Sequence, residues 1–138
     1  MRGRRIAFDF GEARIGVAIC DPDGILATPL PYVEARKPKV IAEIVALCEE
    51  YQPITIFLGR PTHLSGAAGE SVAKVDEFAA RISEKVSIPI VFIDERLSTV
   101  DAQRRLREAG KNAKESRQLV DSMAAVMILE TGLLHEKD

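Results

Sequence analysis

Three acidic residues stand where a folded chain could bring them together around a metal ion. Asp9 closes the apolar run 5–10, Glu95 follows the apolar run 88–93, and Asp121 begins an apolar helical stretch. Charges at the ends of buried elements are costly unless a partner neutralises them. Hard carboxylate oxygens favour Mg²⁺ or Mn²⁺ over zinc. We therefore expect a divalent-metal site, while a strand-end or helix-cap role for each acid taken separately stays open.

A basic stretch lies between two of these acids. From Ala102 to Gln118 only two acids accompany six cations, which are Arg104, Arg105, Arg107, Lys111, Lys114 and Arg117. If one helix covers them, steps of three and four residues place the last three on roughly the face of Asp121. Exposed cations beside acids are suited to binding phosphate groups. The alternative is a solvated, charged helix face of no functional importance.

A glycine-containing segment follows one of the expected strands. Gly59-Arg60-Pro61 comes after an apolar run, and Gly66 and Gly69 follow it before a helical pattern begins. Backbone amides at such a junction could approach phosphate. The segment is not a Walker loop, because no Gly-Lys-Ser/Thr follows it. On its own it indicates a phosphate contact only weakly.

Length and composition limit the class of protein. The 138 residues favour a single domain over 1–138, and the formal net charge of −2 gives no global reason to expect a nucleic-acid partner. The basic stretch supplies that reason locally. No run approaches the roughly 18 apolar residues of a membrane span, and no signal peptide is apparent. We expect a cytoplasmic protein in which Cys48, on an apolar helical stripe, is a core thiol.

The elements that must position these residues follow from hydrophobic periodicity. Alternation and turn residues predict three antiparallel strands at 5–10, 15–20 and 25–29. Further strands are expected at 54–58 and 88–93, and helices at 40–51, at 72–82, from Ser98 as N-cap, and at about 116–134. This order predicts an α/β fold with a five-stranded mixed sheet, three antiparallel strands followed by two parallel ones, flanked by helices.

Four segments together carry a resemblance to a known family: residues 9–18, Gly59-Arg60-Pro61 with Gly66, residues 94–99 (Asp-Glu-Arg-Leu-Ser-Thr), and Asp121 with Ala124-Ala125 and Ile128-Leu129. In this order, and over essentially the whole chain, they resemble the YqgF (RuvX-type) family of pre-16S rRNA nucleases, which are also called Holliday-junction-resolvase-like proteins. The resemblance implies a ribonuclease-H-like fold. It also implies a hydrolase that cleaves phosphodiester bonds at the 5′ end of the 16S rRNA precursor during ribosome biogenesis.

The resemblance further implies a role for individual residues. Asp9, Glu95 and Asp121 would be the catalytic, metal-binding acids of a two-metal site for Mg²⁺ or Mn²⁺. One ion would lower the pKa of the attacking water, and the other would stabilise the leaving 3′-oxygen. Substrate contacts would come from Arg14, Arg96, Lys111, Lys114, Arg117, Gly59 and Arg60. The chain departs from the family pattern at Arg60, where leucine is usual, and at Cys20, where serine is frequent.

Other functions stay open on the sequence alone. A DNA endonuclease acting on Holliday junctions is the nearest, and a non-catalytic rRNA-binding assembly factor is the next. With two Tyr, five Phe and no Trp, the chain shows no rich base-stacking platform that would distinguish RNA from DNA. A ribosomal precursor particle is a further expected partner. Junction cleavage would require a homodimer, whereas trimming of an rRNA end would not, so both monomer and homodimer are retained.

Overall fold

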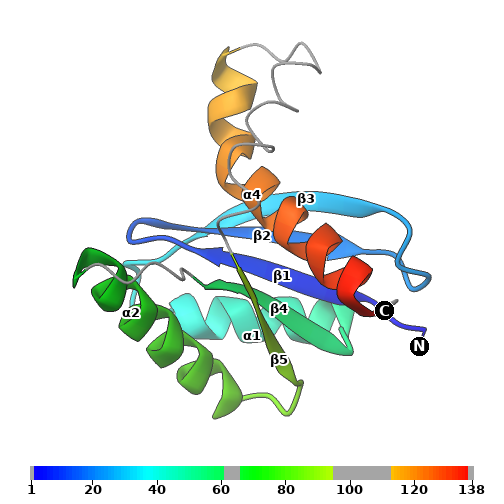
Figure 1. Ribbon diagram of the computed structural model, residues 1–138, viewed down its shortest axis with the longest axis horizontal. Helices are drawn as coiled ribbons and strands as arrows, with labels where there is room; N and C mark the ends of the chain where they lie inside the picture. The colour runs from blue at the N-terminus through cyan, green and yellow to red at the C-terminus, as the bar shows by residue number, and fades with distance from the viewer. Residues whose placement is uncertain (1, 61–65, 95–112, 137–138) are drawn as a thin grey trace.

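The computed structural model describes the backbone of residues 2–60, 66–94 and 113–136, and the side chains of residues 2–60, 72–94 and 122–136. Figure 1 shows a sheet with helices on both faces. The elements in chain order are β1 (Arg5–Phe10), β2 (Arg14–Cys20), β3 (Ala27–Glu34), α1 (Val40–Tyr51), β4 (Thr55–Arg60), α2 (Gly66–Ser83), β5 (Ile90–Asp94) and α4 (Ala113–Glu136). The helix expected from Ser98 falls outside the described residues.

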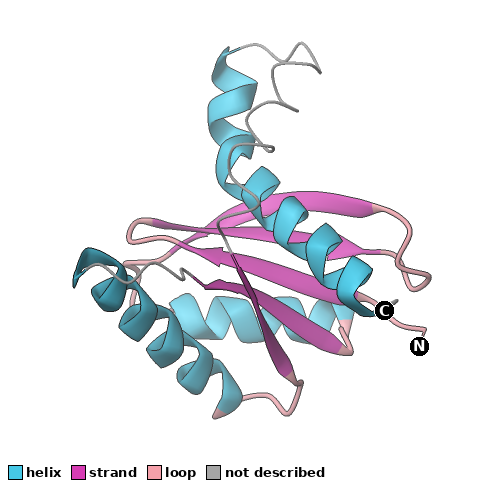
Figure 2. Cartoon of the chain, in the orientation of Figure 1, coloured by secondary structure: helices cyan, strands magenta, loops and turns pink. Residues whose placement is uncertain are grey.

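The five strands form one mixed sheet in the order β3-β2-β1-β4-β5. Strands β1, β2 and β3 pair antiparallel, while β4 pairs parallel with both β1 and β5. Figure 2 shows α1 and α2 on one face of the sheet and α4 on the other. The predicted fold class is therefore confirmed, including the change from antiparallel to parallel pairing.

The β1–β2 hairpin is tight, as the sequence predicts. The Gly11 amide donates to the carbonyl oxygen of Arg14 at 3.0 Å. A Cβ at Gly11 would lie only 2.7 Å from that same oxygen, so a larger residue would force the turn apart. This turn keeps the end of β1 beside the start of β2.

The predicted start of α2 was wrong, because the helix begins at Gly66 rather than near residue 72 and so includes Gly66 and Gly69. The prediction for the third strand was also wrong. It was expected at 25–29, but β3 begins at Ala27 and continues to Glu34. The turn lasts longer because the Asp21 carboxylate accepts hydrogen bonds from the amides of Ile25 and Leu26, at 2.7 and 3.1 Å. The strand also continues past its prolines, because β3 is at the edge of the sheet, where a residue without an N–H is tolerated.

Strand alternation divides the apolar side chains into two cores. Ile6 and Phe8 face α1 and α2, whereas Ala7 belongs to the core beneath α4. Cys48 is buried in the first core, where burial raises its thiol pKa to about 11, so the prediction of a core thiol is confirmed. Cys20 is buried in the second core.

Helix α4 is longer than the predicted 116–134 and is fixed to the sheet by its C-terminal half. Its buried side chains include Ala125, Ile128 and Leu129. At its end, Glu136 accepts from the buried Arg5 guanidinium at 2.9 and 3.0 Å. Its N-terminal turns extend beyond the sheet (Figure 1). No helix in the described part of the chain is long and apolar enough to cross a membrane.

Replacing Gly132 by alanine should destabilise the protein, because α4 crosses Phe57 at this glycine. A Cβ there would lie 2.7 Å from three carbon atoms of the buried Phe57 ring. Overpacking of this kind costs about 1–3 kcal/mol, which exceeds the gain of at most about 1 kcal/mol in helix propensity. Urea unfolding measures the difference. A Gly132→Ala protein at least as stable as the parent would show that α4 moves away from Phe57 at little cost.

Candidate functional site

The carboxyl ends of the three parallel strands meet at one edge of the sheet. Phe8 is level with Leu58, and Leu58 with Phe92. One residue further along, the strands therefore bring Asp9, Gly59 and Ile93 to the same level. The structure thus places two of the predicted site residues, Asp9 and Gly59, side by side on neighbouring strands.

The Asp9 side chain is flanked by strand positions that carry no side chain. Asp9 is half-buried, and alternation puts it on the α4 face together with Ala7. The residue paired with Asp9 on β2 is Gly16. Gly59 occupies the corresponding position on the same face of β4. Both glycines are buried. No cross-strand side chain from these two positions competes with a ligand for the Asp9 carboxylate.

A buried serine fixes α4 over this part of the sheet. The Ser122 hydroxyl donates to the carbonyl oxygen of Leu30 at 2.5 Å and accepts from the amide of Val17 at 3.5 Å. The β2–β3 register shifts between Ile15 and Val17, so the hydroxyl joins the two strands beside an irregularity. Val17 directly follows Gly16, the residue paired with Asp9. Asp121 directly precedes Ser122 in α4. The backbone of Asp121 is therefore held near the Asp9 end of β1.

Several predicted site residues cannot be placed with their side chains. Glu95, Arg96 and Lys111 lie outside the described residues, and Lys114, Arg117 and Asp121 are described only as backbone positions of α4. Among the side chains that the structure does describe, no three His, Cys, Asp or Glu residues form a metal-binding group. The metal site formed by three acids therefore stays a prediction. Of the three acids, the structure describes the side chain of Asp9 alone, at the edge of the sheet where β1 and β5 end.

Arg14 begins β2 at the same edge. The hairpin places it close to the end of β1, and alternation puts it on the face of Gly16. Its guanidinium lies 4.9 Å from the centre of the Tyr32 ring, a distance typical of a cation–π contact. Arg14 is exposed, so its positive charge faces solvent two residues before Gly16, the residue paired with Asp9.

Arg60 has partners that the sequence did not indicate. Its guanidinium binds both carboxylate oxygens of Asp76 in α2 at 3.1 Å and lies 5.3 Å from the centre of the Phe92 ring. The hydrogen bonds to Asp76 raise the pKa of Arg60. Alternation along β4 puts Arg60 on the face opposite Asp9. In the described structure it joins the end of β4 to α2, and its contact with substrate stays a prediction.

Replacing Arg60 by leucine, the residue usual in the resembled family, should change stability by less than about 1 kcal/mol, because exposed ion pairs contribute little. The two side chains are 38% and 47% exposed. Urea unfolding of Arg60→Leu, of Asp76→Ala and of the double variant measures the coupling. Loss of nucleic-acid binding in Arg60→Leu but not in Asp76→Ala would assign Arg60 to the substrate. A stability loss above about 2 kcal/mol would contradict the small structural role.

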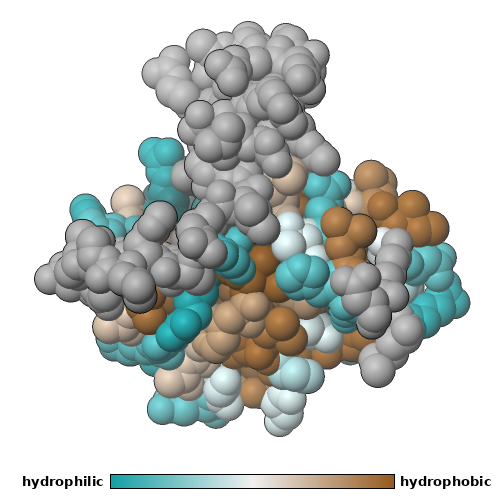
Figure 3. Space-filling model, viewed as in Figure 1, coloured by the Kyte–Doolittle hydropathy of each residue, from teal (hydrophilic) through white to brown (hydrophobic). Residues whose placement is uncertain are grey.

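The described part of the face that carries α4 is mixed in character. Figure 3 shows hydrophobic and hydrophilic residues interleaved on the face that carries α4. The exposed large hydrophobic residues of the described chain are Ile25, Leu26, Val91, Phe92 and Leu134.

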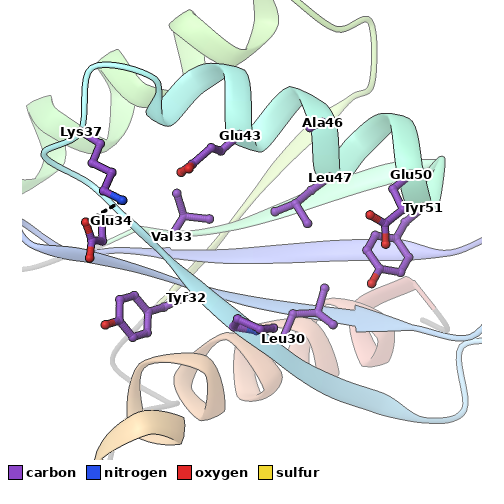
Figure 4. A pocket seen from close by; sticks show the side chains of 11 residues that line it. Leu30, Tyr32, Val33, Glu34, Lys37, Glu43, Ala46, Leu47, Glu50 and Tyr51 are labelled. Carbon is purple, nitrogen blue, oxygen red and sulfur yellow. Dashed lines mark ion pairs between the residues drawn. The ribbon is translucent and has the colours of Figure 1, made fainter.

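A groove of about 640 Å³ lies elsewhere, between α1 and β3 (Figure 4). Since α1 covers the face opposite α4, this groove is separate from the Asp9 edge.

Two solved structures with this arrangement of elements are complexes with Holliday junctions. One is a complex titled "T. thermophilus RuvC in complex with Holliday junction substrate", with a TM-score of 0.63 at 12% identity over 98% of this chain and 96% of that one. Another is the Fowlpox virus resolvase in complex with Holliday junction DNA, with a TM-score of 0.63 at 10% identity over 98% and 99% of the two chains. At these identities the likeness shows the fold alone, which is that of the RuvC-like resolvases.

Sequence relatives are much closer. The "Putative pre-16S rRNA nuclease" of Streptomyces avermitilis is 45% identical over 99% of this chain and 88% of its own length. The RuvX family model, described as Holliday junction resolvase, matches residues 3–135. With nearly the whole chain matched by both comparisons, this protein belongs to the RuvX family.

Proposed function

We propose that this chain is a divalent-metal-dependent nuclease that processes the 5′ end of pre-16S rRNA in the cytoplasm. The observation that carries the proposal is the position of Asp9 at the carboxyl end of β1, flanked by Gly16 and level with Gly59. Membership of the RuvX family and the name of the 45% identical relative support the reaction and the substrate.

The donor set fits a hard divalent cation. Asp9, Glu95 and Asp121 would hold Mg²⁺ or Mn²⁺, because carboxylate oxygens are the ligands these ions prefer. Asp9 is half-buried, and the residue opposite it on β2 is Gly16. When bound, the metal would activate water and stabilise the charge that develops at the phosphate. The chain's own contribution is to hold Asp9 near the end of strand β1 and Asp121 on helix α4.

The cations are arranged to hold the substrate backbone. Arg14 is exposed at the Asp9 end of the sheet, and Lys114 and Arg117 belong to the turns of α4 that extend beyond the sheet (Figure 1). Arg96 and Lys111 would add to this basic surface. By binding the phosphates, these cations would position the phosphodiester bond to be cleaved beside the acids. Substrate binding would weaken as the salt concentration rises, because counterion release drives it.

A DNA endonuclease that cuts four-way junctions is the second candidate, because the matching family model carries the description Holliday junction resolvase. Symmetric cutting of two strands would require a homodimer. Processing of an rRNA end within a ribosomal precursor particle requires only one copy, so we propose that a monomer suffices for the rRNA substrate.

A side-by-side assay tests these alternatives. Purified protein is incubated with a pre-16S rRNA fragment carrying its 5′ extension and with a four-way DNA junction, in Mg²⁺, in Mn²⁺ and in EDTA. We expect cleavage of the rRNA fragment with either metal and none in EDTA. Cleavage of the junction alone would show that the substrate is branched DNA and not pre-16S rRNA. Metal-independent RNA binding without cleavage would instead indicate an assembly factor.

A further inference from the structure

The groove between α1 and β3 lies on the face of the sheet opposite Asp9. It measures about 640 Å³ and is drawn in Figure 4. Its walls come from two short stretches, residues 30–34 of β3 and residues 43–51 of α1, with Lys37 from the connection between them. All of these side chains are among those that the structure describes.

The floor of the groove is apolar. Leu30, Val33, Leu47 and Tyr51 contribute to it. Val33 belongs to the core beneath α1, and the other three pack against that core. Leu47 and Tyr51 are one helical turn apart and only half-buried. Apolar side chains that are left partly open beside a continuous core provide a contact surface for a further apolar side chain.

The rim of the groove is acidic. Glu34, Glu43 and Glu50 line it together with a single cation, Lys37, which already pairs with Glu34 at 3.2 Å. Glu43 and Glu50 are exposed, and the hydrogen bond that Tyr51 donates to Glu50 raises the pKa of the tyrosine. Two such carboxylates would repel a phosphate backbone and attract a basic partner.

The two carboxylates are also regularly spaced. Glu43 and Glu50 are seven residues apart in α1, which is two helical turns or about 10.5 Å. Leu47 lies between them on the same side of the helix. A second helix with cations seven residues apart and an aliphatic residue between them would match this pattern of charge and apolar surface.

Strand addition is the less favourable way to fill the groove. Within the described residues β3 is the last strand of the sheet, but Pro29 and Pro31 lack the N–H groups that a new strand would need. A partner would therefore contribute side chains from a helix rather than a paired backbone, as in helix-in-groove recognition.

We propose that this groove binds a basic amphipathic helix of a partner protein, with Lys or Arg on Glu43 and Glu50 and an aliphatic side chain on Leu47. The inference goes beyond the nuclease function and does not depend on it. Because Asp9 is on the other face of the sheet, the partner and a nucleic-acid substrate would bind at the same time. The groove would thus attach the enzyme to a basic protein while its catalytic edge stays accessible.

The test uses the full chain and a designed fluorescent peptide. The peptide is an alanine-rich helix with lysines seven residues apart and leucines three and four residues after the first lysine; its control has glutamates in place of the lysines. Fluorescence anisotropy is measured at physiological ionic strength. We expect binding of the lysine peptide only, weakened about tenfold or more in the double variant Glu43→Lys/Glu50→Lys.

A matched variant separates the groove from general charge effects. Glu77, in α2, and Glu84, directly after it, are also exposed and seven residues apart, and neither residue lines the groove. Glu77→Lys/Glu84→Lys should weaken binding less than about twofold. Equal weakening in both double variants, or displacement of the peptide by single-stranded RNA, would overturn the proposal. So would dimerisation of the parent chain that Glu43→Lys/Glu50→Lys abolishes, because a second copy would then occupy the groove. Rates of nucleic-acid cleavage report separately on the nuclease function.

Discussion

Asp9→Asn should abolish metal-dependent cleavage and leave the fold intact. Asparagine keeps the size of the side chain but removes the negative charge that a divalent cation requires. Mutation of a residue that only supports a metal ligand already lowers metal affinity or activity about 10–100-fold. Loss of a ligand itself should therefore lower activity more than about 100-fold. The half-buried position between Gly16 and Gly59 leaves space for the amide, which is why we expect no unfolding.

Two measurements make this result specific. The first is the cleavage rate of the pre-rRNA fragment in Mg²⁺ and in Mn²⁺, and the second is the rise in melting temperature that Mn²⁺ gives the parent protein. Both should be lost in Asp9→Asn and kept in Asp23→Asn, which alters an exposed aspartate paired with Arg2 in the β2–β3 turn. Undiminished turnover in Asp9→Asn would exclude Asp9 as a metal ligand.

The sequence predicted the fold well because its strands follow simple periodicities. Residues 5–10 form β1 as expected, and the helix expected at 40–51 is α1. The third strand was misplaced because its start depends on hydrogen bonds to the Asp21 side chain. Its end depends on the strand's being at the sheet edge, where Pro29 is tolerated. Neither of these determinants is visible in a local pattern of apolar residues.

The site was predictable only as far as strand ends determine it. The end of an apolar run marked Asp9, and the parallel pairing then placed it level with Gly59. The Arg60–Asp76 pair was missed because it joins residues sixteen apart from different elements, and Asp76 is one of several acids on α2. The groove was missed for a related reason, since the sequence shows that α1 is amphipathic but not how far β3 lies from it.

Ser122→Ala should destabilise the protein, because it removes a buried hydrogen-bonding group. Ser122 is completely buried, and alanine would leave the Leu30 carbonyl and the Val17 amide without the hydroxyl that joins them. A buried polar group that loses its partner costs about 1–3 kcal/mol. The register shift beside Val17 makes replacement by a strand partner difficult. Urea unfolding measures this cost directly.

The same substitution should also slow cleavage, because Ser122 fixes the turn of α4 that carries the predicted ligand Asp121. We expect the metal concentration needed for half-maximal activity to rise, which general loss of stability would not cause while the protein stays folded. Thr131→Ala is the matched control, since that hydroxyl bonds only to Met127 of the same helix in the described structure, at 2.8 Å. If Thr131→Ala and Ser122→Ala raise the metal requirement equally, the bridge to β2 and β3 does not position Asp121. If only Ser122→Ala raises the metal requirement, the Ser122 hydroxyl positions Asp121 on α4 relative to Asp9 on β1.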